Sequence, residues 1–429
     1  MNRVLRFYII GIFSLVFLFY LLYLYYYKKA GISYFSLRGD SLYFWVATIA
    51  VFIFLCSSRA LLSHDLYEYS LRARMISFYG LNPYLHTPME IKNDMFFPLI
   101  FWRRFTECYG PAWSLIGSFH AFFFPRSILL TGFLHKLVLL LFLISGGAVF
   151  YALAEGLKSK NSGILTLSFI TNPLLIIMTL IDGHNEIVMI FFVLCSLYFL
   201  IRSKYLGALV MLALSISVKF IYLLAAPLYI TYILRDTGYL SLRQRIYKAA
   251  AACALSFLII LLLWLPFGKE SFIAYINYFK AVQYFWSDSI PYAVYFILGK
   301  IGVSIPEQLV VGISSAVFII LYTWLWYSFA RTGENKKEAL ITTVGLMVLA
   351  LLATNYSAFQ AWYLLWALPL ILLSRLKTKS LLVFLLSYFL ILSFWKRMSV
   401  LAIPMAILYF VLLKTRIYET RLKSFFSLE

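Results

Sequence analysis

Residues 127–153 read SILLTGFLHKLVLLLFLISGGAVFYAL, and Lys136 is the only Lys, Arg, Asp or Glu in this run. A helix needs about 20 apolar residues to cross the roughly 30 Å of bilayer hydrocarbon, so the run predicts a membrane-spanning helix. Comparable runs recur from Phe7 to Leu413. The chain of 429 residues is 63% hydrophobic and 13% charged, which excludes a soluble enzyme, a disordered chain and a secreted disulfide scaffold. Because the runs are continuous rather than alternating, they indicate helices and not a transmembrane β-barrel.

The sequence predicts an all-α polytopic membrane protein with about 13 transmembrane helices. The run at 206–234 is divided at Lys219, because a single helix there would place an ammonium group in the middle of the bilayer. Two short helices that meet at Lys219 avoid this cost. The expected helices are residues 7–27, 41–62, 127–153, 163–181, 187–201, 206–218, 220–234, 249–266, 308–330, 339–353, 362–373, 381–394 and 399–413.

The net charge of +20 reflects Lys and Arg in short connections between the apolar runs. Cytoplasmic loops carry such an excess, so residues 158–160, 202–204, 235–248, 331–337, 375–379 and 414–423 are predicted to be cytoplasmic. The N-terminus is then outside, although Arg3 and Arg6 favour the opposite orientation for the first helix. Residues 63–126 and 267–307 face outward, and within the first of these segments 111–124 is expected to be a helix along the membrane interface.

The first outward polar group follows the second apolar run and includes His64, Asp65 and Glu68, with Arg72 and Arg74 beyond. At the membrane edge a carboxylate has apolar walls on one side and water on the other, so its basicity can be adjusted. Asp65 is therefore a candidate general base. The alternative is that Asp65 only begins a helix and meets the dipole of that helix.

A second group, Asp182-Gly183-His184-Asn185-Glu186, lies between the fourth and fifth runs. A tight turn needs one glycine, and the other polar residues are costly at membrane depth unless they bind something. They are predicted to bind substrate, with a capped, solvated turn as the alternative. Lys219 is placed to hold a phosphate as a point charge, or else to pair with one of these acids inside the protein.

Weaker candidates are Tyr109, which precedes the interfacial helix, and Gln360 and Trp362 in an aromatic connection. Aromatic residues at such positions are usually interface anchors, and sugar stacking is the less common role. Neither CxxC nor HxxxH spacing occurs, so no metal site is predicted from the residues.

The polar groups in this order resemble the GT-C membrane glycosyltransferases. The ordered set is most similar to the polyprenyl-phosphomannose-dependent mannosyltransferases, across residues 41–375. The motifs that carry the resemblance are His64-Asp65-x-Tyr67, Gly80-x-Asn82-Pro83-Tyr84, Tyr109-Gly110-Pro111, Asn172-Pro173, Gly183-His184-Asn185-Glu186, Lys219 with Ala225-Ala226-Pro227, and Trp362-Tyr363-Leu364-x-Trp366.

The resemblance implies an inverting glycosyltransferase that moves a sugar, mannose by analogy, from a polyprenyl-phosphate donor to a lipid-linked or glycan acceptor. Asp65 matches the catalytic base, and Lys219 with Arg72 or Arg74 would hold the donor phosphate. Glu186 stands where such mannosyltransferases more often have Asp. No cofactor is certain, a divalent metal is possible, and nucleic acid is not expected. The residues expected to bind substrate are His64, Glu68, Tyr109, Asp182, His184, Asn185, Glu186, Gln360 and Trp362.

The same reasoning predicts three parts: an extra N-terminal helix at 1–40, a catalytic module at 41–375, and C-terminal helices with a basic tail at 376–429. The expected location is a bacterial cytoplasmic membrane, with the site facing outward. Two other classes of protein stay open on the residues alone. A flippase for lipid-linked sugars would show repeats and broken helices at the midplane, and an O-antigen ligase or polymerase would use a large outer loop.

Overall fold

The computed structural model describes residues 3–30, 40–123, 126–282, 289–333, 336–354, 360–374, 383, 387 and 388. In these residues the regular structure is entirely helical, which confirms the all-α class. The helices are α1 (Arg3–Ala30), α2 (Asp40–Cys56), α3 (Asp65–Ser77), α4 (Pro111–Phe123), α5 (Ile128–Gly156), α6 (Ser162–Ile170), α7 (Pro173–Ile176), α8 (Glu186–Ile201), α9 (Tyr205–Ile216), α10 (Ala226–Asp236), α11 (Leu242–Trp264), α12 (Lys269–Val282), α13 (Ile290–Lys300), α14 (Glu307–Arg331), α15 (Lys336–Thr354) and α16 (Leu368–Leu373).

Several of these helices are long and apolar enough to cross a membrane, as expected of an integral membrane protein. Five qualify by length and composition in the described residues, and a bent pair of shorter helices brings the number to six. They are Gly11–Lys29, Ile128–Gly156, Leu242–Trp264, Glu307–Arg331 and Lys336–Thr354, with the pair Ser162–Ile170 and Pro173–Ile181. The expected spans at 41–62, 187–201, 206–218 and 362–373 are shorter apolar helices, and the one at 220–234 is a 3₁₀ turn followed by α10. Those at 381–394 and 399–413 lie outside the described residues except at 383, 387 and 388.

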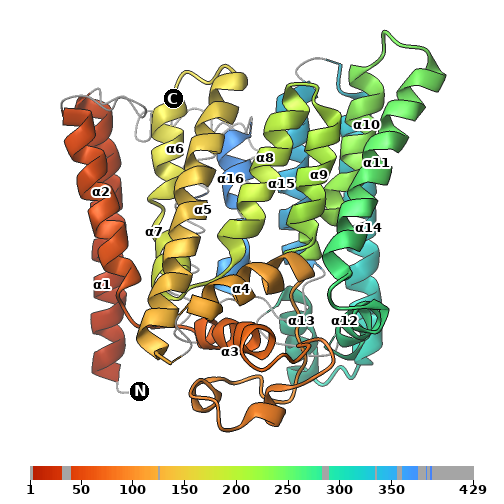
Figure 1. Ribbon diagram of the computed structural model, residues 1–429. Helices are drawn as coiled ribbons and strands as arrows, with labels where there is room; N and C mark the ends of the chain where they lie inside the picture. Colours follow the sequence, from red (N-terminus) through yellow and green to blue (C-terminus); the bar gives the residue numbers. More distant parts are fainter. Residues whose placement is uncertain are drawn as a thin grey trace. The chain divides into compact units, whose positions relative to one another are not determined.

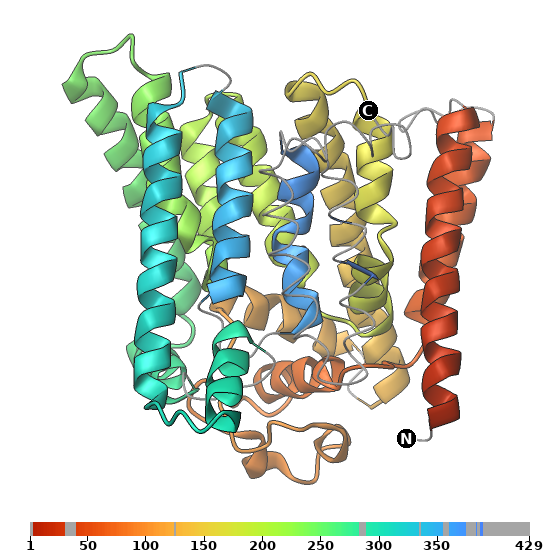
Figure 2. The ribbon, with the colours of Figure 1, turned by 180° about the vertical axis from the view of Figure 1, so that it is seen from behind.

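The chain forms two compact units. The first unit comprises Met1–Gly31, Leu157–Leu175 and Tyr284–Glu429, and the second unit comprises Ile32–Gly156 and Ile176–Gln283. In the first unit α14 packs beside α15, and α13 contacts both (Figure 2). In the same unit α6 contacts α1 and α16.

In the second unit α5 packs on α8, α8 on α9, and α9 on α11, so that these helices stand side by side (Figure 1). The shorter helices α3 and α4 lie across one end of this layer and pack on each other (Figure 1). The helix predicted at 111–124 is therefore present as α4 (Pro111–Phe123). Both crossing helices have 13 residues, which is too short for a span.

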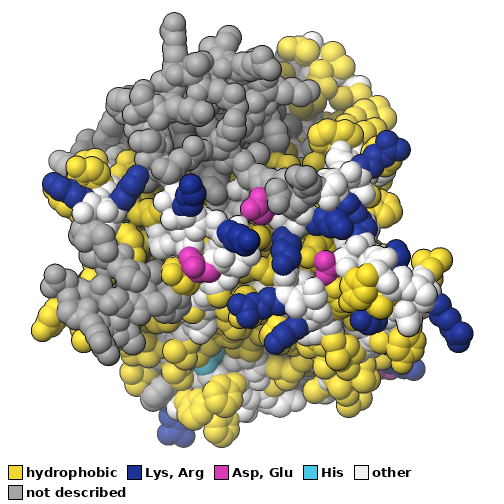
Figure 3. Space-filling view, turned by 90° about the horizontal axis from the view of Figure 1, so that it is seen from above, with side chains coloured by type: hydrophobic (Ala, Val, Ile, Leu, Met, Phe, Trp, Pro, Cys, Tyr) yellow, Lys and Arg dark blue, Asp and Glu magenta, His cyan; other side chains and the backbone are white. Residues whose placement is uncertain are grey.

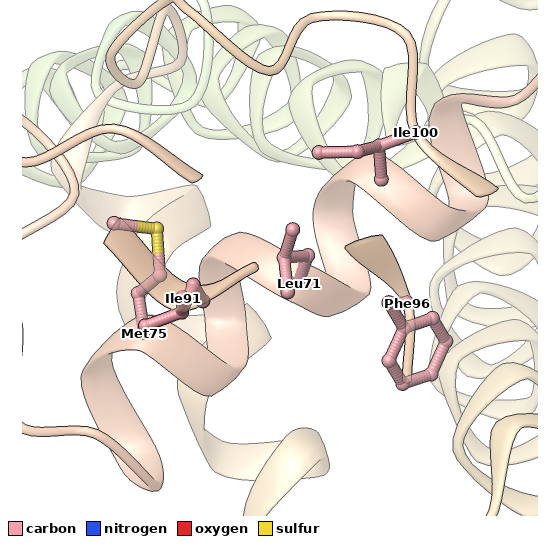
Figure 4. Packing of buried hydrophobic residues seen from close by; sticks show 5 residues of the cluster. All are labelled: Leu71, Met75, Ile91, Phe96 and Ile100. Atoms are coloured by element: carbon pink, nitrogen blue, oxygen red, sulfur yellow. The ribbon is translucent and has the colours of Figure 1, made fainter. Parts of the chain in front are cut away.

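An outer segment, residues 78–110, packs on α3 through a small hydrophobic cluster (Figure 4). Leu71 and Met75 of α3 contact Ile91, Phe96 and Ile100 of this segment. The segment contains the short 3₁₀ turns Pro88–Ile91 and Phe97–Leu99. Burying these side chains fixes the outer segment to the helix that begins with Asp65.

The helical break predicted at Lys219 is confirmed. α9 ends at Ile216, Lys219 has extended backbone angles (φ −146°, ψ 134°), and a 3₁₀ turn at Phe220–Ala225 leads into α10. Lys219 lies near the start of α4, because the N–H of Gly110 donates to the carbonyl of Val218, the residue before Lys219. The helix α4 crosses one end of the layer (Figure 1).

The opposite end of the second unit carries basic residues in its connections. Arg202 and Lys204 join α8 to α9, and Arg243 and Arg245 begin α11. Figure 3 looks onto this face and shows many Lys and Arg side chains but few carboxylates among the described residues. The basic connections and the crossing helices α3 and α4 therefore lie at opposite ends of the layer, as the charge pattern predicts.

Candidate functional site

Asp65 is the first residue of α3, directly after the second apolar helix. Its backbone N–H donates to Ser63 Oγ at 3.1 Å, which supports the start of the helix. Its Oδ2 atom lies 3.5 Å from Nδ1 of His184, and its side chain is 19% exposed whereas that of His184 is fully buried. The carboxylate that can meet solvent is thus in contact with the polar turn between two apolar helices.

That turn is held tightly on the side facing α3. Gly183 has a φ of +73°, a conformation that favours glycine, and a Cβ atom there would lie 2.8 Å from Leu66 Cδ1, so the turn packs closely on α3. The preceding Asp182 accepts hydrogen bonds through Oδ1 from the backbone N–H groups of Leu61 at 2.7 Å and Leu62 at 2.9 Å. The turn is therefore bound to the chain that leads into Asp65.

Lys219 joins the same cluster from the other side. Its ammonium group forms an ion pair with Glu186 Oε1, and Glu186 Oε2 lies 3.8 Å from His184 Nδ1. Nζ of Lys219 also lies 4.8 Å from the centroid of the Tyr109 ring, a cation–π arrangement. Asp65, His184, Glu186 and Lys219 therefore form a continuous row, although 154 residue numbers separate its ends.

Backbone contacts bring the start of α4 against the turn that carries Lys219. The N–H of Gly110 donates to the carbonyl of Val218, and the N–H of Ala112 donates to the carbonyl of Ser217, each at 3.0 Å. A Cβ atom on Gly110 would lie 2.2 Å from the Ser217 carbonyl oxygen. Only glycine allows this approach, which places the Tyr109 ring over Lys219.

Asn185 sits inside the cluster with its polar groups unsatisfied. Its side chain is fully buried, and in the described part of the chain neither its amide nitrogen nor its amide oxygen has a hydrogen-bond partner. Buried polar atoms are normally paired, so such a group needs an explanation. A ligand rich in hydroxyl groups would supply both a donor and an acceptor.

The electrostatics of the cluster favour a weak acid at Asp65. Burial raises the pKa of Asp65 above its ordinary value, while His184 and Lys219 act in the lowering direction. Burial lowers the pKa of His184 to about 4, so its imidazole is neutral at neutral pH. Burial raises the pKa of Asp182 to about 6, against the lowering effect of the hydrogen bonds from Leu62 and Leu61.

Three predicted site residues on α3 are engaged with the outer segment. Arg74 binds Asp94 with an Nη2–Oδ2 distance of 2.7 Å. Arg72 donates through Nη2 to the carbonyls of Trp102 at 3.3 Å and Phe105 at 3.0 Å. Glu68 Oε1 accepts from the N–H groups of Phe101 and Trp102. These three side chains hold the outer segment, and their predicted roles toward substrate stay predictions.

The other predicted residues lie apart from the row of ionisable groups or in the first unit. His64 is exposed, with its ring 6.3 Å from that of Tyr67. Gln360 precedes the 3₁₀ turn Ala361–Trp366, and the half-buried Trp362 packs edge-on to Tyr363. Gln360 and Trp362 belong to the first unit, so their part in substrate binding also stays a prediction.

The sequence interpretation did not assign roles to Tyr69 and His135. Tyr69 donates to the Tyr109 hydroxyl at 3.2 Å and stacks on His135 at 5.8 Å. His135 is an ionisable residue within an apolar run, and that signal alone could have marked it. In the described residues no group of three or more His, Cys, Asp or Glu side chains could hold a metal ion.

One known protein family matches more than half of the chain. No curated protein matches the chain. Residues 3–235 match the family described as "Alpha-(1->6)-mannopyranosyltransferase, N-terminal domain". The matched range contains Asp65, the turn at 182–186 and Lys219, and it includes α1, which the resemblance left outside the conserved module. The chain therefore belongs to the alpha-(1->6)-mannopyranosyltransferase family of GT-C membrane enzymes, which transfer mannose from polyprenyl-phosphomannose.

Proposed function

We propose that this chain transfers mannose from polyprenyl-phosphomannose to an acceptor hydroxyl, with Asp65 as the general base. The observation that carries the proposal is the row Asp65, His184, Glu186 and Lys219, in which a partly exposed carboxylate and a cation are joined through buried side chains. A polyprenyl-phosphate sugar is already activated, so the protein has to align the reactants, accept a proton and stabilise the departing phosphate.

In the proposed reaction Asp65 takes the proton of the acceptor hydroxyl. The hydroxyl oxygen then forms a bond to the anomeric carbon of mannose, while the bond from that carbon to the phosphate oxygen breaks. The electron pair of the broken bond stays on the phosphate, and the configuration at the anomeric carbon inverts. A base with a raised pKa suits this step, because general catalysis is most efficient when the pKa approaches the working pH.

Lys219 is the proposed contact for the donor phosphate. Its ammonium has three N–H donors, and the ion pair with Glu186 and the Tyr109 ring hold it in place beside the cluster. A charge-assisted hydrogen bond from such a group stabilises the negative charge that grows on the leaving phosphate. Asn185 is the proposed partner for sugar hydroxyls, since its buried amide has both a donor and an acceptor to satisfy.

The proposal includes the finer membrane arrangement: about 13 spans, a site on the extracytoplasmic face of a bacterial cytoplasmic membrane, and a lipid-linked or glycan acceptor. The basic connections of the second unit support this orientation, because they lie at the end of the helical layer away from α3 and α4 (Figures 1 and 3).

The experiment that tests the base is Asp65→Asn in purified protein in lipid nanodiscs, with labelled polyprenyl-phosphomannose and native membrane acceptor. We expect kcat to fall by a factor of about 10²–10⁴, the usual contribution of a general base. The matched control is Glu90→Gln, an exposed carboxylate of the outer segment whose contacts are with His86 and the Thr87 backbone. Turnover of Asp65→Asn close to that of the control would remove Asp65 from the mechanism.

A double-mutant cycle separates the two interpretations of Lys219. If Lys219 binds phosphate, Lys219→Met should raise the donor KM about tenfold or more, equivalent to about 1.4 kcal/mol. The double variant Lys219→Met/Glu186→Gln should then be no better. If Lys219 only neutralises Glu186, removing both charges should restore the donor KM, and this recovery would refute the phosphate role.

A further inference from the structure

A pair of buried histidines lies beside the site and has no part in the proposed chemistry. His120 of α4 and His135 of α5 are each 1% exposed. Nε2 of His120 lies 3.1 Å from Nδ1 of His135, and Nε2 of His135 lies 2.8 Å from the carbonyl oxygen of Gly183. The pair thus connects two helices to the turn that carries His184.

The contacts determine where the protons are. The Gly183 carbonyl can only accept, so Nε2 of His135 carries the hydrogen and donates. A neutral imidazole with a proton on Nε2 has a lone pair on Nδ1, so His120 must donate to it through Nε2. Burial lowers the pKa of His120 to about 4, against the raising effect of a backbone hydrogen bond with Ile116, and this keeps the imidazole neutral.

The ring of His135 is also held by aromatic contacts. Tyr69 of α3 stacks on it with planes 8° apart, and Trp113 of α4 meets it edge-on at 5.5 Å. Packing on two sides and hydrogen bonds at both nitrogens leave this ring one orientation. The donor to Gly183 is therefore fixed in direction as well as in protonation.

The turn that receives this hydrogen bond has little room to move. On one side Gly183 lies against Leu66, the neighbour of Asp65, where even an added Cβ atom would be 2.8 Å from Leu66 Cδ1. Asp182 is bound to the N–H groups of Leu61 and Leu62. The hydrogen bond from His135 holds the carbonyl group of Gly183. The next residue in the chain is His184, which faces Asp65.

We propose that His135, with His120 hydrogen-bonded to its other ring nitrogen, is a positioning residue that holds the Gly183 turn and thereby sets the distance between His184 and Asp65. This inference rests on the proposed role of Asp65. It predicts that losing the donor at position 135 disturbs the chemical step and the ionisation of the base, while binding of the donor substrate is unchanged.

The test compares His135→Leu with His135→Gln in nanodiscs, using polyprenyl-phosphomannose as the donor. The amide nitrogen of Gln can stand in for Nε2, whereas Leu has no donor. We expect His135→Leu to lower kcat about tenfold with donor KM unchanged, since a misplacement of 1 Å can cost about 10²-fold. The acid limb of its pH–rate profile should move to higher pH, because Nδ1 of His184, 3.5 Å from Asp65 Oδ2, is a polar neighbour that favours the ionised carboxylate, and a displaced turn would move it away. His135→Gln should restore both quantities.

Leu139→Ala is the control, because Leu139 is fully buried on the same helix one turn further along. It removes a buried apolar side chain and leaves the hydrogen-bond donor at position 135 in place, so its pH profile should stay that of the wild type. Equal kcat and pH profiles for His135→Leu and His135→Gln would overturn the inference. If His135→Leu does not fold, His120→Leu against His120→Gln makes the same comparison with the His135 ring intact. Asp65→Asn is assayed in parallel. If Asp65→Asn is active, the proposed role of Asp65 as general base is wrong. If Asp65→Asn is inactive and the histidine variants have wild-type activity, only the positioning role of His135 is wrong.

Discussion

Gly110→Ala is a test of how the site is assembled, because position 110 carries no chemistry of its own. A methyl group there would lie 2.2 Å from the carbonyl oxygen and 2.6 Å from the carbonyl carbon of Ser217. Both are backbone atoms, so no side-chain rotation relieves the overlap. The start of α4 would have to move by about 1 Å from residues 217–219 to reach ordinary van der Waals separation.

The expected size of the effect follows from the contacts that this movement breaks. Overpacking costs about 1–3 kcal/mol. The movement would also break the Gly110–Val218 and Ala112–Ser217 hydrogen bonds. A backbone group that then stays buried without a partner costs about 1–3 kcal/mol. We expect the variant to lose about 2–6 kcal/mol of stability if one of these groups stays unpaired. Lys219 follows this turn directly, so kcat/KM should fall about 10²-fold.

The assay measures thermal unfolding and mannose transfer by the same nanodisc preparation. Gly117→Ala is the matched control on the same helix: its nearest atom outside the local backbone would be Ala73 Cβ at 3.5 Å, an ordinary contact. Alanine is favoured over glycine inside a helix, so this variant should gain about 0.5–1 kcal/mol and keep its activity. Wild-type stability and turnover for Gly110→Ala would show that the close approach of α4 to residues 217–218 is wrong.

Two further predictions concern the carboxylates of the cluster. Asp182→Asn should retain activity, because the amide oxygen can still accept hydrogen bonds from the N–H groups of Leu61 and Leu62. Asp182→Ala lacks this acceptor and should lose about 1–3 kcal/mol of stability, measured by thermal unfolding. Loss of mannose transfer in a stable Asp182→Asn protein would instead indicate that Asp182 contacts the substrate. For Asp65, the raised pKa means that kcat/KM should rise with pH through the ionisation of the base and fall below it. Since Lys219 lowers that pKa, Lys219→Met should shift the acid limb of the pH–rate profile to higher pH, and an unshifted limb would contradict the assignment.

Much of the fold was predictable because it follows from the cost of polar groups in hydrocarbon. The run at 127–153 is α5, and the division at Lys219 is observed between α9 and α10. Two helices of the segment 267–307 were missed, α12 (Lys269–Val282) and α13 (Ile290–Lys300). They are short and amphipathic rather than long and apolar. Ser289, which accepts from the Tyr292 N–H, and Pro291 in the first turn mark the start of α13 by capping chemistry.

The sequence predicts which types of residue occur in the candidate site, but not which of these side chains contact one another. Asp65 and Lys219 were expected to converge, and the structure brings them into one row. Arg72 and Arg74 are cations on the same short helix as Asp65, yet their side chains turn to the outer segment. The packing of residues 78–110 on α3 determines which groups these two arginines contact. No local sequence pattern around Arg72 or Arg74 predicts that packing.

The charges of the row suit the proposed reaction, in which negative charge moves from Asp65 to the leaving phosphate. Within the row Lys219 and Glu186 balance each other and His184 is neutral, so the ionised Asp65 of the proposed mechanism carries the one uncompensated charge. Before transfer, that charge faces a donor phosphodiester of the same sign. When Asp65 accepts the proton it becomes neutral, and the phosphate gains the charge that Asp65 has lost. Total charge in the site is conserved, so repulsion between base and phosphate does not increase as the bond breaks. Glu186 and Glu68 each raise the pKa of Asp65, and the ion pair of Glu186 with Lys219 offsets part of that effect.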